Sequence, residues 1–78
     1  MKLPHGVSAN PLIRALWRVG YAVLRQKGSH MRLRHGGPPA NLITIPHHNP
    51  FKTRTLHGIL AEVARIRSIS VESFAESL

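Results

Sequence analysis

The stretch GGPPA at residues 36–40 constrains the fold most, because a run of glycine and proline cannot continue a strand and must form a loop. Apolar residues alternate with polar ones before it and recur after it. This pattern predicts two strands, at 30–35 and 41–45, that pair antiparallel across the loop. The loop length sets the register, with His35 opposite Asn41 at the end of the hairpin.

That register decides which side chains share a face of the sheet, since side chains alternate along a strand. Four apolar residues fall on one face, which we expect to cover the core: Met31, Leu33, Ile43 and Ile45. His30, Arg32 and Arg34 share the opposite face with Thr44, and His30 lies across from Pro46. A slip of one residue would put both isoleucines into water, so the register is well specified.

The N-terminal part predicts a helix over about 9–19. Ser8 or Asn10 can act as its N-cap, apolar residues recur at helical spacing, and Gly20 supplies the C-terminal stop. We expect Trp17 to pack at the edge of the core.

A further strand is expected at 21–27, followed by a tight turn at 28–29. Its alternation is ambiguous. In the better fit, the apolar residues Ala22 and Leu24 point inward, and the cations Arg25 and Lys27 point outward.

The C-terminal part predicts two helices. Thr53 can cap the first, and Ser70 can cap a short second one over about 71–77. One side of the longer helix is apolar: Leu56, Ile59, Leu60, Val63 and Ile66. The resulting order is helix, three strands, helix and short helix, which is an α+β sandwich of one three-stranded antiparallel sheet and one helical layer. We expect a single domain over 1–78, with a flexible tail at 1–7.

Charge indicates the class of partner. The 78 residues hold 11 Lys and Arg against three acids, a formal net charge of +8, and the acids are Glu62, Glu72 and Glu76. Such a field favours polyanions, above all nucleic acid, or an acidic protein that mimics one. Cysteine is absent, which excludes disulfides and thiolate chemistry. No apolar run approaches the roughly 18 residues of a membrane span, so we expect a cytoplasmic protein with no membrane partner.

The open face of the sheet therefore carries a basic surface that can bind a phosphate backbone. Its members are Arg25, Lys27, His30, Arg32 and Arg34. Tyr21 is the one aromatic residue near it, so stacking of bases is poorly supported. Continuing the register puts Ser29 opposite His47, which brings His47 and His48 close to His30.

Several of these segments together resemble the HicA (YcfA-like) family of toxin ribonucleases. They are Gly20-Tyr21, the run from Arg25 to His30 (RQKGSH), Ile45-Pro46-His47, Thr55-Leu56 with Ile59-Leu60, and Ile69 to Phe74. The resemblance covers about residues 8–78.

The resemblance implies a fold like that of the double-stranded-RNA-binding domain and cleavage of messenger RNA without a metal or other cofactor. It also implies neutralisation by a HicB-type antitoxin, and a catalytic role for His30, the histidine of the Gly-Ser-His motif. The chain departs from the usual family pattern at Met31, where a histidine or polar residue is common, and at Arg54, where glycine is common.

Metal-free RNA cleavage uses the 2′-hydroxyl of the substrate as nucleophile, so the protein moves protons and stabilises a crowded phosphate. Histidine suits the first task. We expect His30 to carry it, with His47 as a candidate second proton carrier, and Lys27 and Arg32 to stabilise the charge on the phosphate. The residues expected to contact RNA are Arg25, Lys27, Ser29, Arg32 and Arg34.

Three alternatives stay open from the residues. His30, His47 and His48 could bind zinc, although no carboxylate is available nearby to support such a site. The chain could instead be a non-catalytic module that binds double-stranded RNA by shape, or a DNA-binding component. We interpret His5, His35 and His57 as ordinary tail, hairpin-end and helix-surface residues.

Overall fold

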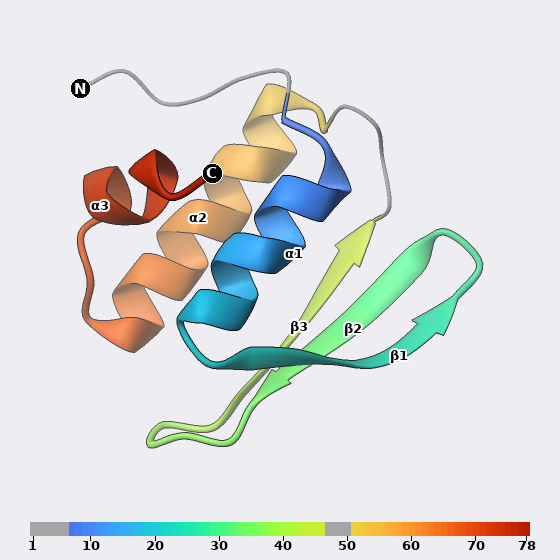
Figure 1. Cartoon of the computed structure of the whole chain (residues 1–78), viewed down its shortest axis with the longest axis horizontal. Coiled ribbons are helices and arrows are strands. Elements are labelled where there is room, and N and C mark those ends of the chain that lie inside the picture. Colours follow the sequence, from blue (N-terminus) through green and yellow to red (C-terminus); the bar gives the residue numbers. More distant parts are fainter. Residues whose placement is uncertain (1–6, 47–50) are drawn as a thin grey trace.

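The computed structural model describes residues 7–46 and 51–78. Its elements in chain order are α1 (Ala9–Arg18), β1 (Tyr21–Lys27), β2 (His30–His35), β3 (Asn41–Pro46), α2 (Thr53–Arg67) and α3 (Val71–Glu76), as Figure 1 shows. The chain is α+β, and the predicted order of helix, three antiparallel strands, helix and short helix is confirmed. None of the helices in this described part has the length and apolar character needed to span a bilayer.

The sheet has the strand order β1-β2-β3, so β2 is the central strand and pairs antiparallel with both neighbours. The register between β2 and β3 is the predicted one, from His30 opposite Pro46 to His35 opposite Asn41. On β2, Met31 and Leu33 are buried, whereas Arg32 between them is exposed. One face of the sheet therefore meets the core and the other is open to solvent.

Helices α1 and α2 cover the buried face of the sheet and lie side by side (Figure 1). The core is one cluster to which both helices, α3 and the sheet all contribute. Its largest fully buried side chains are Leu12, Leu16, Tyr21, Leu33, Ile45, Leu56, Leu60 and Val63. Val7, expected in a flexible tail, packs against this core, and its carbonyl oxygen accepts a hydrogen bond from the N–H of Phe51 at 2.8 Å. Residues 1–6 of the expected tail lie outside the described residues.

In β1, the prediction that Ala22 and Leu24 point inward is wrong. Ala22 pairs with Arg34 and Val23 with Leu33, but the register shifts between Val23 and Arg25, which leaves Leu24 without a partner. An unpaired extra residue of this kind is a β-bulge, and it reverses the alternation that follows it. Ala22 consequently lies on the open face, and both Ala22 and Leu24 are exposed rather than turned inward.

The two cations of β1 nevertheless lie where they were expected. Beyond the bulge, Arg25 pairs with Arg32, and Lys27 pairs with His30. Directly opposed residues point to the same face, so Arg25 and Lys27 both lie on the open face.

The N-cap residues of the three helices agree with the sequence predictions except for small differences. Ser8 occupies the N-cap position of α1, although its side chain makes no capping hydrogen bond. Lys52 rather than Thr53 is the N-cap residue of α2, so Thr53 is the first helical residue. Ser70 caps α3 as predicted, and its hydroxyl oxygen accepts a hydrogen bond from the N–H of Ser73 at 2.9 Å.

On α1, Trp17 is 69% exposed, so the prediction that it packs at the edge of the core is wrong. Leu16, the residue before it, is buried instead.

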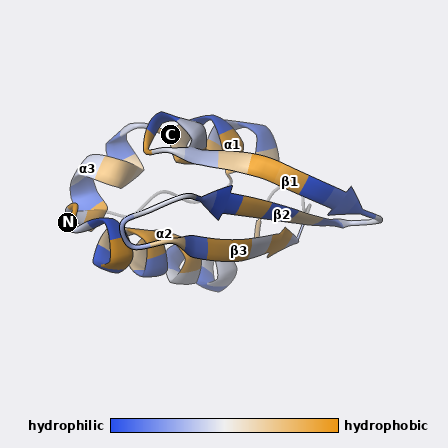
Figure 2. Ribbon diagram, turned by 90° about the horizontal axis from the view of Figure 1, so that it is seen from below, coloured by the Kyte–Doolittle hydropathy of each residue, from blue (hydrophilic) through white to orange (hydrophobic). Residues whose placement is uncertain are grey.

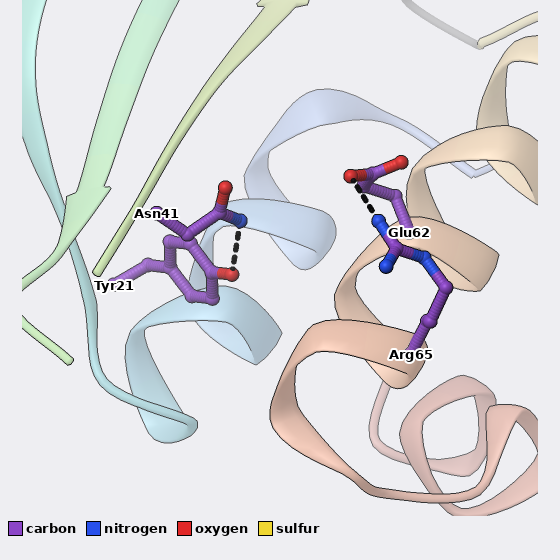
Figure 3. Close-up of polar contacts among 4 residues, drawn as sticks. All are labelled: Tyr21, Asn41, Glu62 and Arg65. Atoms are coloured by element: carbon purple, nitrogen blue, oxygen red, sulfur yellow. Dashed lines mark hydrogen bonds and ion pairs between the residues drawn. The ribbon is translucent and has the colours of Figure 1, made fainter. Parts of the chain in front are cut away.

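The end of the sheet near the C-terminus of α2 is tied together by polar contacts. The side-chain amide of Asn41 donates to the hydroxyl of Tyr21 at 2.7 Å (Figure 3). The guanidinium of Arg67 lies 5.7 Å from the centre of the Tyr21 ring and donates to Nδ1 of His35 and to the carbonyl oxygen of Pro39. Arginine can only donate, so Nδ1 of His35 is an acceptor, and His35 is a structural residue.

Gly20 is packed against this cluster, and we expect Gly20→Ala to destabilise the protein. Its φ is +104°, a conformation that other residues rarely adopt, and an added Cβ would lie 2.5 Å from Nε2 of His35. His35 cannot move away freely, because its Nδ1 also accepts a hydrogen bond from the N–H of Gly37. Backbone strain alone costs about 1–3 kcal/mol. Urea denaturation measures the loss of unfolding free energy.

Gly36→Ala is the matched control for that substitution. An added Cβ at Gly36 meets nothing within 4 Å, and its φ is not positive. We expect a change within about 0.5–1 kcal/mol, in the stabilising direction, since alanine restricts the unfolded chain. Equal losses in the two variants would show that the contact with His35 is not the cause.

Candidate active site

The turn between β1 and β2 places the central residue of the candidate site. Gly28 has a φ of +58°, and Ser29 follows it with a negative φ, which fits the type II′ turn that joins two strands across two residues. Lys27 and His30, on either side of the turn, are directly paired. In Figures 1 and 2 the turn projects beyond the helices, and all residues from Ala22 to His30 are exposed.

Two neighbouring rows of side chains cross the open face behind this turn. The first row is Lys27, His30 and Pro46, and the second is Arg25, Arg32 and Thr44. They surround a depression of about 540 Å³, lined by Arg25, Lys27, Gly28, Ser29, His30, Arg32 and Thr44. The structure thus brings together the predicted residues His30, Lys27, Arg25, Arg32 and Ser29 on one surface.

The depression is strongly basic. Three cations line it together with His30, and no acid does. The three glutamates lie on α2 and α3, and one of them, Glu62, pairs with Arg65 at 3.0 Å (Figure 3). Among the described residues the His30 ring makes no hydrogen bond, and His30 is exposed to solvent. This arrangement can hold a phosphate on its cations while an imidazole reaches an adjacent hydroxyl.

Arg34 lies on the same face but outside this depression. It belongs to the third row, with Ala22 and Leu42. It lines a second depression of about 400 Å³ together with Leu24, Ala40, Asn41 and Leu42. The predicted register already puts Leu42 opposite Arg34, whereas the alternation expected for β1 turned Leu24 inward, so its exposure was not predicted.

His47 and His48 lie outside the described residues, so their predicted proximity to His30 stays a prediction. The same holds for a zinc site built from these three histidines. Within residues 7–46 and 51–78, no group of three or more His, Cys, Asp or Glu side chains is placed to hold a metal ion.

Comparison with known protein families gives a match over most of the chain. A protein-family model described as the HicA toxin of bacterial toxin–antitoxin matches residues 9–64, from the start of α1 into the last turn of α2. No curated protein and no solved structure matches the chain. The family match covers more than two thirds of the sequence and includes the whole sheet with His30. The chain therefore belongs to the HicA toxin family, as the toxin of a toxin–antitoxin system that has an antitoxin as its partner.

Proposed function

We propose that this toxin is a metal-independent endoribonuclease that cleaves messenger RNA with His30 as general acid/base, and that a HicB-type antitoxin neutralises it. The observation that carries the proposal is the depression in which exposed His30 lies beside Lys27, Arg25 and Arg32 with no carboxylate. RNA cleavage of this kind requires cations that bind the phosphate and a base that takes the proton of the adjacent 2′-hydroxyl. The depression offers both kinds of group on one surface.

In the proposed reaction the 2′-oxygen attacks the adjacent phosphorus, and the bond from phosphorus to the 5′-oxygen breaks. His30 takes the proton of the 2′-hydroxyl, and a second group donates a proton to the departing 5′-oxygen. The products are a 2′,3′-cyclic phosphate and a free 5′-hydroxyl. The second group in this proposal is His47, which follows Pro46 in the sequence; Pro46 is the residue paired with His30.

The cations have separate tasks in this scheme. Lys27, paired with His30, and Arg32, two residues along β2, hold the non-bridging oxygens as negative charge builds on the reacting phosphate. Arg25, which pairs with Arg32, and Ser29, in the turn beside the depression, are proposed to contact the RNA next to the reacting phosphate. Same-face positions two residues apart are separated by about 7 Å, so Arg34, two residues from Arg32, is proposed to contact a neighbouring phosphate.

Incubation of the purified chain with end-labelled RNA in excess chelator tests the activity. We expect single-stranded RNA to be cleaved to fragments with a 2′,3′-cyclic phosphate, and single-stranded DNA of the same sequence to stay intact, because it has no 2′-hydroxyl. Binding of double-stranded RNA or DNA without any cleavage would instead identify a binding module and reject the nuclease proposal.

The salt dependence of RNA binding tests the cations. Each phosphate contact with a single strand adds about −0.7 to the slope of log affinity against log salt concentration. We therefore expect Lys27→Ala and Arg32→Ala each to reduce the steepness of that slope by about 0.7. Fluorescence anisotropy with 2′-O-methyl RNA measures binding alone, since this RNA lacks the attacking hydroxyl.

Arg14→Ala is the matched control for charge. Arg14 is exposed on α1, which covers the opposite face of the sheet. Its loss removes one positive charge without touching the open face, so the slope should not change. A slope that falls equally in all three variants would show that net charge, rather than the depression, determines RNA binding.

A further inference from the structure

The open face is not uniformly basic, because apolar side chains cluster at the end away from the turn. We call this cluster the leucine patch; its residues are Ala22, Leu24, Arg34, Ala40 and Leu42, and all of them are exposed. Leu24 is 60% and Leu42 46% exposed. Figure 2 shows the change along β1, from hydrophobic in its middle to hydrophilic at the turn.

Pairing across the sheet forms this patch. Ala22 pairs with Arg34, and Arg34 pairs with Leu42, so these three side chains form one row on the open face. Leu24, the unpaired residue of the bulge, lines the depression that holds Arg34, Ala40 and Leu42. Four residues of the patch, together with Asn41, line a depression of about 400 Å³, and the guanidinium of Arg34 is the one charged group in its lining.

The patch is continuous with the candidate active site. Arg34 and Arg32 lie on the same face, two residues apart on β2, and His30 lies a further two residues along. At about 3.3 Å per residue, Arg34 and His30 are roughly 13 Å apart. A protein domain seated on the patch therefore also extends over the His30 depression.

RNA and a second copy of the chain both fit this patch poorly. Apart from Arg34, the patch consists of leucine and alanine side chains, which offer neither a charge for phosphate nor a ring for stacking with bases. A second copy of the chain carries the same net charge of +8. Face-to-face contact between two copies would bring like-charged rows together, which is unfavourable.

An antitoxin protein can supply both the apolar side chains and the carboxylate that this patch would accept. Protein interfaces join apolar contacts to a few buried arginines, and such arginines are frequent among the residues that dominate affinity. We propose that the leucine patch is the anchor for the antitoxin, which inserts apolar side chains between Leu24 and Leu42 and pairs a carboxylate with Arg34. This proposal rests on the proposed neutralisation of the His30 face, and it separates inhibitor binding from RNA cleavage within that face.

The test measures the affinity of the purified cognate antitoxin for Leu24→Ala and Leu42→Ala variants, with no RNA present. The toxin chains are co-produced with antitoxin, separated in denaturant and refolded, and circular dichroism checks the fold. We expect Kd to rise about 10-fold or more in each variant, the effect typical of residues that dominate an interface. RNA cleavage without antitoxin should stay within about twofold of wild type, since neither leucine contacts the depression around His30.

Trp17→Ala is the matched control, because Trp17 is a large apolar side chain that is 69% exposed on α1. Its Kd for the antitoxin should equal that of the wild type. The proposal is overturned if both leucine variants bind the antitoxin as tightly as wild type, or if they lose RNA binding instead. It is also overturned if they change only self-association in a dilution series.

The outcome is independent of the nuclease proposal. A wild-type chain that binds the antitoxin but cleaves no RNA would reject the proposed activity, while the affinities of the leucine variants would still decide whether the patch is the anchor.

Discussion

Replacing His30 with alanine should lower the rate of RNA cleavage by about 100- to 10,000-fold, the usual contribution of a positioned general acid or base. His30 is exposed at the edge of the depression and contributes nothing to the core. The variant should therefore keep the melting temperature of the wild type. Initial rates on labelled RNA in excess chelator measure the effect.

Two further measurements make this result specific. Binding of 2′-O-methyl RNA by His30→Ala should stay within a few fold of wild type, because the cations that contact phosphate remain. Arg14→Ala should cleave RNA at the wild-type rate. If His30→Ala keeps full activity while His47→Ala loses it, the assignment of His30 as the principal proton carrier is wrong.

The largest effect on stability is expected for Leu33→Ala. Leu33 is 0% exposed on the central strand and belongs to the core between the sheet and the helices. Truncation of a buried leucine to alanine costs about 2–5 kcal/mol. Domains with 78 residues typically have only about 4–12 kcal/mol of unfolding free energy in total. Urea denaturation should show a much lower midpoint or an unfolded chain.

Leu42→Ala is the control for that substitution, since it makes the same chemical change on the opposite face. Leu42 is 46% exposed and pairs with Arg34, whereas Leu33 pairs with Ile43 under the helices. We expect a loss of no more than about 1 kcal/mol. Similar losses in the two leucine variants would contradict the assignment of faces to β2 and β3.

The register of β2 and β3 could be predicted from the sequence because three local signals agree. The loop at 36–40 admits no strand, alternation in both flanking segments has a period of two, and a slip would expose Ile43 and Ile45. These signals place His30, Arg32 and Thr44 on the open face before any tertiary contact is considered.

Strand β1 could not be predicted in the same way. It is an edge strand with one neighbour, and its middle, Ala22 to Leu24, is apolar throughout, so either parity satisfies the pattern. The bulge at Leu24 resolves the conflict by keeping Tyr21 buried while still turning Arg25 and Lys27 outward. In a regular strand, burying Tyr21 would also turn Arg25 and Lys27 inward, so an extra residue between them is needed to expose both cations. The alternation of apolar and polar residues does not show where such an extra residue lies.

By itself the sequence determined the order of the elements, the pairing of β2 with β3 and the face on which His30 lies, because each follows from contacts between residues close in the chain. Only the tertiary structure decided the position of Leu24 beside Arg34 and the role of His35, whose partner Arg67 is 32 residues away. Backbone alternation has a short, regular period that sequence shows directly. A bulge or a long-range hydrogen bond depends on which surfaces meet after the helices pack on the sheet.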